Sequence, residues 1–208
     1  MLLVDGAWDC RRCFVVGGGP SLRGFPWHRL EGELVVSANL SCPYPTVSVT
    51  TDARFVRKMP RGILEKWLTY PGLHVHVNRQ LQARVPGVEF VQPCSGWSYS
   101  LADGVIAQSN TGLSAVNLAD ILRATPIYLL GFDMKGEECD TPRGRRALTA
   151  NWHDAYPAKW RSNACVYETR YIPDFERHAR RAVGRIVNLT PGSALTCFEV
   201  GRVEDVLK

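Results

Sequence analysis

Long apolar runs are missing from this sequence of 208 residues. No stretch approaches the roughly 18 consecutive apolar residues that a membrane helix needs. The opening MLLVDGAWDCRR has its basic residues after a short apolar run, which is the reverse of the order in a signal peptide. The sequence therefore predicts no membrane span and a cytoplasmic location.

A paired cysteine framework is also missing. The seven cysteines are odd in number and scattered, which argues against a set of disulfides. Cys10 and Cys13 form a CxxC, but no second CxxC and no paired histidine follows at zinc-ligand spacing. We expect reduced thiols, and the spacing argues against a metal or redox role for this pair.

Charge of one sign is not in large excess. The net charge is +5, with 45% hydrophobic and 22% charged residues, a balance typical of a soluble globular chain. A modest positive charge suits an anionic ligand without requiring one. No linker or internal repeat divides the chain, so we expect a single domain over residues 1–208.

Short apolar runs recur along the chain, separated by turn residues. Several are continuous rather than alternating, which indicates strands covered on both faces and hence a parallel sheet. The runs are 13–16, 33–38, 46–50, 73–77, 88–91, 127–132 and 185–189. Helical patterns lie between them, notably 53–70 with breaks at Pro60 and Gly62, 111–124, and 173–184.

This alternation predicts an α/β fold with a Rossmann-like, mostly parallel sheet flanked by helices. Residues 135–167 differ because they are polar, rich in arginine and tryptophan, and weakly periodic. We expect them to form an irregular, lid-like excursion over the mouth of a site.

Polar or glycine-rich residues follow four of the expected strands. GGGPSL (17–22) follows the first, Asn39 the second, Asp52 the third, and Gly131 to Asp133 follow IYLL. Ligands of open α/β sheets bind outside the carboxyl ends of the strands, so these residues are the candidates for a binding site.

Three successive glycines predict that something approaches the backbone closely. One interpretation is a phosphate held by main-chain amides, and the other is a tight structural turn. The loop matches neither G-x-G-x-x-G nor the P-loop pattern, which argues against a hydride cofactor and a P-loop kinase.

Two further stretches carry chemistry. SNTG (109–112) opens a helix, where its residues either cap backbone amides or face an anion or sugar hydroxyl. NWHDAYP (151–157) places His153 in an irregular aromatic segment, where it is either a general base or a surface histidine. The other four histidines are expected to be structural or exposed.

VVGGGPSL, SNTGLSAVNLADILRATPIYLLGFDM, NWHDAYP and IVNLTPGSALTCFE resemble, in this order, the MptE-like phage and bacterial proteins grouped with archaeal 6-hydroxymethylpterin diphosphokinase. More distantly they resemble the bacterial sialyltransferases that carry GNGPSL. The matched order covers most of residues 13–199. The resemblance implies a nucleotide-dependent transferase in the cytoplasm of a bacterial or phage-infected host cell.

The resemblance also implies roles for individual residues. Donor contacts are implied for Gly17, Gly18, Gly19, Pro20, Ser21, Asn39, Asn110, Thr111, Gly112, Gly131 and Ser193. Asn188, Thr190, Pro191 and Leu195 match the family's closing segment with Ser193. His153 falls where the sialyltransferases have their catalytic base, and Asp133 and Lys135 complete the implied catalytic set. Asp52 and Asp133 resemble the acidic residues that would hold Mg²⁺ in the diphosphokinase branch.

Two departures weaken the sialyltransferase match. Gly18 replaces the asparagine of GNGPSL, and MKGEE after GFD lacks the phosphate-binding tyrosines of those enzymes. Lys135 would supply positive charge instead.

Three hypotheses follow. The first is a glycosyltransferase-like enzyme with a nucleotide-sugar donor, His153 as base, and Lys135 or Arg143, Arg145 and Arg146 stabilising the departing phosphate. The second is a Mg²⁺-dependent diphosphokinase that passes pyrophosphate from ATP to a hydroxymethyl acceptor. The third is a non-catalytic nucleotide or nucleic-acid binding module, suggested by cations and aromatics near residues 143–161. The acceptor, whether glycan, small molecule or modified DNA, and the oligomeric state are left open.

Overall fold

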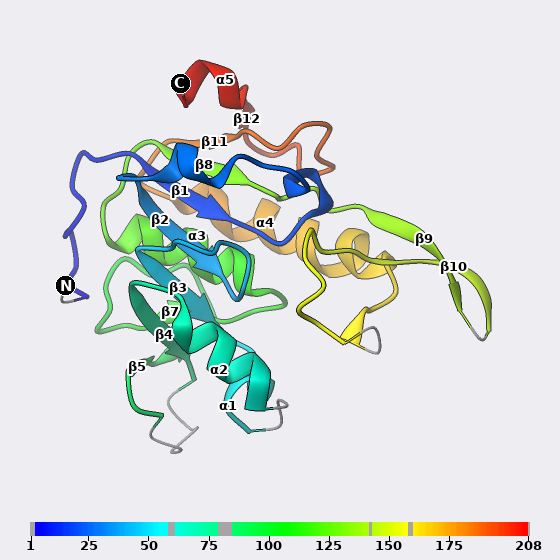
Figure 1. Ribbon diagram of the computed structural model, residues 1–208. Coiled ribbons are helices and arrows are strands. Elements are labelled where there is room, and N and C mark those ends of the chain that lie inside the picture. Colours follow the sequence, from blue (N-terminus) through cyan, green and yellow to red (C-terminus); the bar gives the residue numbers. More distant parts are fainter. Residues whose placement is uncertain (1–2, 58–60, 79–84, 142, 158–159, 208) are drawn as a thin grey trace.

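An eight-stranded sheet forms the centre of the computed structural model, which describes residues 3–57, 61–78, 85–141, 143–157 and 160–207 (Figure 1). Every neighbouring pair of strands is parallel, in the order β12-β11-β8-β1-β2-β3-β4-β5. The strands are β1 (Cys13–Val16), β2 (Leu34–Ala38), β3 (Val47–Thr50), β4 (Leu73–Val77), β5 (Val88–Val91), β8 (Ile127–Leu130), β11 (Ile186–Asn188) and β12 (Glu199–Val200). The expected α/β class with a parallel sheet is confirmed.

The central strands are buried on both faces because both faces are covered. Every residue of β1, β2 and β3 is buried. Val15 pairs in register with Val36 of β2 and Leu129 of β8, and these side chains pack on one face. Phe14 and Val16 point to the opposite face. The continuous apolar runs in the sequence therefore reflect burial on two sides.

Helix α3 (Thr111–Ile121) covers one face, and ten of its residues are buried between the sheet and neighbouring segments (Figure 1). The other face is covered by the short 3-10 turns η1 (Pro20–Leu22) and η2 (Trp27–Leu30) and by residues around α5 (Val203–Val206). Helices α1 (Arg54–Arg57) and α2 (Arg61–Thr69) connect β3 to β4 and enclose a third cluster around Phe55 and Trp67. Pro60, one of the expected break points, lies outside the described residues.

The segment after β8 is more regular than expected. Residues 136–149 form an antiparallel hairpin of β9 (Gly136–Thr141) and β10 (Gly144–Thr149), which projects from the body of the molecule (Figure 1). The expectation of irregular structure was wrong here, because an exposed polar hairpin has no apolar periodicity to reveal it. An irregular stretch follows, and then the π-helical η4 (Tyr167–Tyr171), α4 (Ile172–His178) and the turn η5 (Ala179–Arg181). A small sheet of β6 (Pro93–Cys94) and β7 (Val105–Ile106) precedes α3.

The strand order places a topological switch point between β1 and β8. From β1 the chain builds the sheet toward β5, whereas β8, β11 and β12 extend it in the other direction. Loops after β1 and β8 therefore leave the sheet on opposite sides and open a crevice between them. Within the described residues no helix is long and apolar enough to cross a membrane.

Candidate functional site at the switch point

A cavity of about 420 Å³ lies at the carboxyl ends of the central strands. Its walls come from the loops after β1, β2, β3 and β8, from the start of α3, and from the chain between β10 and η4. Ten of the residues singled out in the sequence line it, namely Gly17, Gly18, Gly19, Asn39, Asp52, Asn110, Thr111, Gly112, Gly131 and Asp133. The four strand ends and the helix start are thus brought together.

The described residues that line the cavity do not include five other candidates, which are Pro20, Ser21, Lys135, His153 and Ser193. Two of these hold the closing segment against the end of β8. The Ser193 hydroxyl donates to the carbonyl of Phe132 at 2.5 Å, and the Lys135 ammonium donates to the carbonyl of Gly192. The geometry gives both residues a positioning role beside the cavity.

The glycines of the loop after β1 are explained by close approach of the protein itself. A Cβ on Gly17 would lie 2.7 Å from the carbonyl oxygen of Gly131, and one on Gly18 would lie 2.6 Å from Asn151 Oδ1. On Gly19 it would lie 1.8 Å from Asp133 Oδ2. The close contact that the sequence predicts is therefore made by residues 131, 133 and 151, and a phosphate contact stays a prediction.

The amides of this loop are also largely used within the protein. Gly17 N–H donates to Leu130 at 2.7 Å, Gly19 N–H donates to Gly131 at 2.8 Å, and Ser21 N–H donates to Asp133 Oδ1 at 3.0 Å. Within the described structure, the amide of Gly18 is left without an acceptor. One open amide is not a nest of successive donors, so the loop by itself makes a weak anion site.

Asp133 fastens the loop after β1 to the loop after β8. Its Oδ1 accepts from the Ser21 amide and its Oδ2 accepts from the Ser21 hydroxyl at 2.7 Å. Its backbone carbonyl accepts from Ala194 N–H at 2.9 Å. Both sides of the switch point are therefore held by one carboxylate.

Asp52, the second candidate metal ligand, is paired with a cation. Its carboxylate accepts from the Arg54 amide and guanidinium, with an ion-pair distance of 2.6 Å. Among the described residues there is no group of three or more histidine, cysteine or acidic side chains arranged to hold a metal. With Asp133 engaged by Ser21, the acidic residues of the cavity do not fit a Mg²⁺ site in this arrangement.

The start of α3 offers the cavity open backbone donors. Asn110 caps the helix, because its side-chain oxygen accepts from Leu113 N–H at 2.9 Å. The Thr111 hydroxyl bonds Thr51 at 2.9 Å, which ties the helix to the end of β3. In the described structure the amides of Thr111 and Gly112 have no acceptor, and both residues line the cavity. A helix N-terminus with open amides favours negative charge.

The opposite wall of the cavity is aromatic and basic, and the sequence pointed to this wall only through its composition. Its members are Phe55, Tyr156, Trp160, Tyr167 and Tyr171, with Arg54 and Arg161. The Arg54 guanidinium lies over the Trp160 ring, 4.4 Å from the ring centroid. Burial raises the pKa of Tyr167 to about 12, so its phenol stays protonated at neutral pH. Such surfaces bind flat or sugar rings.

Two lining residues have hydrogen-bonding atoms that the described protein does not use. Asn39, held in a left-handed conformation at φ 59°, has a buried Oδ1 with no donor. Arg161 donates from Nε to Thr149 at 2.6 Å, but its buried Nη2 has no hydrogen-bond acceptor and lies 3.7 Å from Glu137. Buried polar atoms without partners are uncommon in proteins, and a bound ligand or water would satisfy them.

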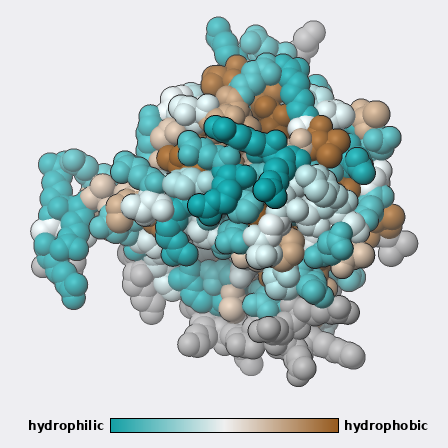
Figure 2. Space-filling model, turned by 180° about the vertical axis from the view of Figure 1, so that it is seen from behind, coloured by the Kyte–Doolittle hydropathy of each residue, from teal (hydrophilic) through white to brown (hydrophobic). Residues whose placement is uncertain are grey.

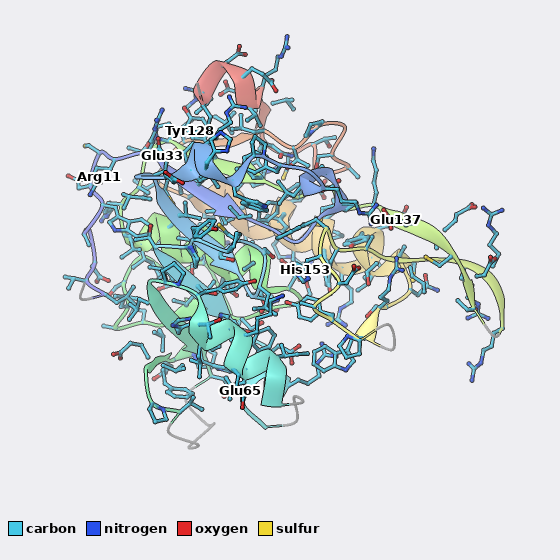
Figure 3. All side chains as sticks on the ribbon, viewed as in Figure 1. Arg11, Glu33, Glu65, Tyr128, Glu137 and His153 are labelled. Atoms are coloured by element: carbon cyan, nitrogen blue, oxygen red, sulfur yellow. The ribbon has the colours of Figure 1, made fainter. Side chains whose placement is uncertain are left out.

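His153, labelled in Figure 3, lies in the segment after β10 and is not among the described residues that line the cavity. Its ring packs 4.9 Å from the ring of Tyr156, centroid to centroid. Burial, reinforced by the charge of Lys66, lowers its pKa to about 4. Nδ1 accepts from Ala155 N–H at 3.2 Å, so the neutral ring carries its proton on Nε2, which is buried without a partner.

Comparison with known proteins shows similarity at the level of the fold. Searches found no matching family model and no matching curated protein sequence. Among solved structures, the chain is similar to the MAf glycosyltransferase from Magnetospirillum magneticum AMB-1, with a TM-score of 0.61 and 11% identity. The similarity covers 100% of this chain and 36% of that one. The fold therefore resembles part of a glycosyltransferase.

Proposed function

We propose that this chain is a nucleotide-dependent transferase of the glycosyltransferase kind, with its donor bound in the cavity at the switch point. The observation that carries the proposal is the position of this cavity between the loops after β1 and β8. Its volume of about 420 Å³ lies within the range of small-molecule sites, which is roughly 300–1,000 Å³. The fold-level similarity to part of a glycosyltransferase supports the same class.

The two walls suit the two parts of a nucleotide-activated donor. The amides of Thr111 and Gly112 and the unused Nη2 of Arg161 favour its phosphate groups. Tyr156 and Trp160 offer rings against which a base or sugar stacks. Asn39 Oδ1 accepts from a hydroxyl or amino group of the ligand. The loop of Gly17 to Gly19 then forms the floor rather than the main phosphate contact.

In the transfer step, the oxygen of the acceptor hydroxyl forms a bond to the anomeric carbon of the donor sugar. The bond from that carbon to the donor phosphate oxygen breaks, and the nucleotide leaves with the electron pair. The hydroxyl proton passes to a base. Positive charge from Arg161 and the helix start stabilises the departing phosphate.

His153 is the base that we propose to test. Burial lowers its pKa to about 4, which keeps the ring neutral at neutral pH but makes it a weaker base than an ordinary histidine, and the ring is not among the described residues that line the cavity. The lone pair of its neutral ring is on Nδ1 and already accepts a hydrogen bond from Ala155 N–H, so the ring acts as a base only after this contact opens or the tautomer changes. His153→Gln should lower turnover by about a hundredfold if the ring takes the proton. An unchanged rate removes it from the mechanism.

A thermal-shift screen with nucleotides and nucleotide sugars, with and without Mg²⁺, tests donor binding. A donor at a hundred times its Kd stabilises the native state by about 2.7 kcal/mol. Arg161→Gln should weaken binding about tenfold. Arg11→Gln, at an exposed position outside the cavity lining, is the matched control. The proposal fails if no nucleotide raises the Tm, or if both variants bind equally well.

The identity of the released nucleotide separates the hypotheses. A glycosyl transfer releases a nucleoside diphosphate or CMP and does not require Mg²⁺ bound to Asp52 and Asp133. A diphosphokinase releases AMP from ATP and needs the metal. Binding without turnover of any acceptor would support a nucleotide-binding module instead. We favour glycosyl transfer because both candidate metal ligands are already paired.

A further inference from the structure

A second cavity adjoins the first at Ser109, which lines both. It has a volume of about 340 Å³ and lies between residues 107–109, which precede α3, and the end of η4 with the start of α4. Its charged lining residues are Arg170, Asp174 and Arg177. Nothing in the donor site described above uses them.

The hydrogen bonds of this second cavity leave positive charge unbalanced. Asp174 Oδ2 accepts from the Ser109 hydroxyl, and its Oδ1 lies 3.7 Å from Arg177, beyond hydrogen-bond distance. Arg170 has neither an ion pair nor a hydrogen-bonded side-chain partner in the part of the chain that the structure describes. The lining therefore contains two guanidinium groups and one carboxylate, which is already hydrogen-bonded to Ser109.

The other polar lining residues do not cancel this charge. Gln108 donates to the carbonyl of Ser95 at 2.6 Å, and Thr169 donates to the carbonyl of Cys165 at 2.8 Å. Both acidic neighbours on the same helical segment, Glu168 and Glu176, lie outside the lining. Figure 2 views the molecule from behind and shows strongly hydrophilic side chains gathered in the middle of that face.

We propose that the second cavity binds a phosphate group carried by the acceptor, with Arg170 and Arg177 as its ligands. The planar guanidinium matches phosphate oxygens in paired hydrogen bonds, and neither arginine has such a partner now. This inference rests on the proposed function, because it assigns the first cavity to the donor and the second to the acceptor. An acceptor anchored here reaches the donor past Ser109.

Arginine modification by phenylglyoxal, followed by peptide mass spectrometry, tests the site residue by residue. Inorganic phosphate is the probe, with sodium chloride at equal ionic strength as the control. At ten times its Kd, phosphate should slow modification of Arg170 and Arg177 about tenfold. The exposed Arg180, which lies outside the cavity, is the internal control. Equal protection of all three, or protection by chloride, overturns the proposal.

Substitution separates binding from folding. Arg170→Gln and Arg177→Gln should each weaken phosphate binding about tenfold, whereas Arg180→Gln should leave it unchanged. The Tm of each variant without phosphate shows whether it is folded. A loss of binding in Arg180→Gln equal to that in Arg170→Gln would indicate a diffuse surface effect and refute the site.

A final measurement shows whether the second cavity binds the acceptor or is part of the donor site. Phosphate protection should persist when the donor nucleotide is saturating. If the nucleotide alone protects both arginines and phosphate adds nothing, the cavity belongs to the donor and the acceptor assignment is wrong. If no nucleotide raises the Tm while phosphate still protects Arg170 and Arg177, the proposed transferase function fails and the acceptor assignment fails with it, although an anion site is present.

Discussion

Burial of His153 should make the free energy of unfolding depend on pH between about 7 and 4. The ordinary histidine pKa is about 6.5, and burial with repulsion from Lys66 lowers it to about 4 in the native state. As the pH falls below 6.5, His153 takes up a proton in the unfolded chain but not yet in the native chain. Protonation therefore favours the unfolded state, and stability falls as the pH is lowered.

The magnitude follows from the difference between the two pKa values. Each pKa unit corresponds to about 1.4 kcal/mol. With values of about 6.5 and 4, linkage gives a loss of about 2 kcal/mol between pH 7 and pH 5, and about 3 kcal/mol at pH 4 and below. For a chain of this length, 2 kcal/mol corresponds to a fall in Tm of about 4–8 °C.

Urea unfolding of the wild type and of His153→Gln at pH 7, 6 and 5 isolates this contribution. Burial also lowers the pKa of His74, His76 and His178, so both proteins lose stability in the same range. The stability of the wild type relative to His153→Gln should therefore fall by about 2 kcal/mol as the pH is lowered from 7 to 5. His28→Gln, at an exposed position, is the control. Parallel curves for the wild type and His153→Gln would refute the reasoning.

Three further predictions concern packing and thiol reactivity. Gly19→Ala should lower the free energy of unfolding in urea by about 1–3 kcal/mol, because its Cβ would lie 1.8 Å from Asp133 Oδ2. Gly62→Ala, in open space on α2, should raise it by up to about 1 kcal/mol. The reverse order of stabilities would contradict this packing. Asp133→Ala should lower the free energy of unfolding by about 1–3 kcal/mol, because the Ser21 amide and hydroxyl lose their acceptor. A variant as stable as the wild type would show that these two hydrogen bonds contribute nothing. In the native protein a thiol reagent should label the exposed Cys165 quickly and the buried Cys13, whose pKa is raised by burial, only on unfolding; equal rates by mass spectrometry would count against this.

Much of the sheet could be predicted because its central strands are buried on both faces. The runs 13–16, 73–77 and 88–91 are the observed strands β1, β4 and β5. The runs for β2, β3, β8 and β11 are each one or two residues too long. Continuous apolar residues mark such strands whatever follows them.

Elements without a buried apolar face could not be predicted in this way. β12 is two exposed residues at the edge of the sheet, and its pairing with β11 is visible only in three dimensions. The hairpin of β9 and β10 pairs Arg145 with Asp140 in register, and Arg145 forms an ion pair with Glu138 at 2.9 Å. Charged pairs across an exposed ladder have no apolar signature in a single sequence.

The candidate site was predicted where it depends on strand ends and missed where it depends on long-range packing. Asn39, Asp52 and Asp133 meet at one cavity because parallel strands present their carboxyl ends together. Arg161 and Tyr171 reach the same cavity from a segment whose path is set by tertiary contacts. Their composition signalled a site, but not which wall they would form.

The glycine loop shows why a motif can mark a site without naming its ligand. Glycine is required wherever another group approaches the backbone closely, whether that group is a phosphate or another part of the protein. Here Gly131 and Asp133 occupy the space next to Gly17 and Gly19. Both lie at the end of β8, the strand on the other side of the switch point. Gly17 and Gly19 are therefore needed to bring the two loops together, whereas Gly18 makes room for Asn151. The groups that a ligand would contact lie instead on the two walls of the cavity. One wall has the open amides at the start of α3, and the other has Arg161 with its aromatic neighbours. Residues on these walls, rather than the glycines, should determine which donor binds.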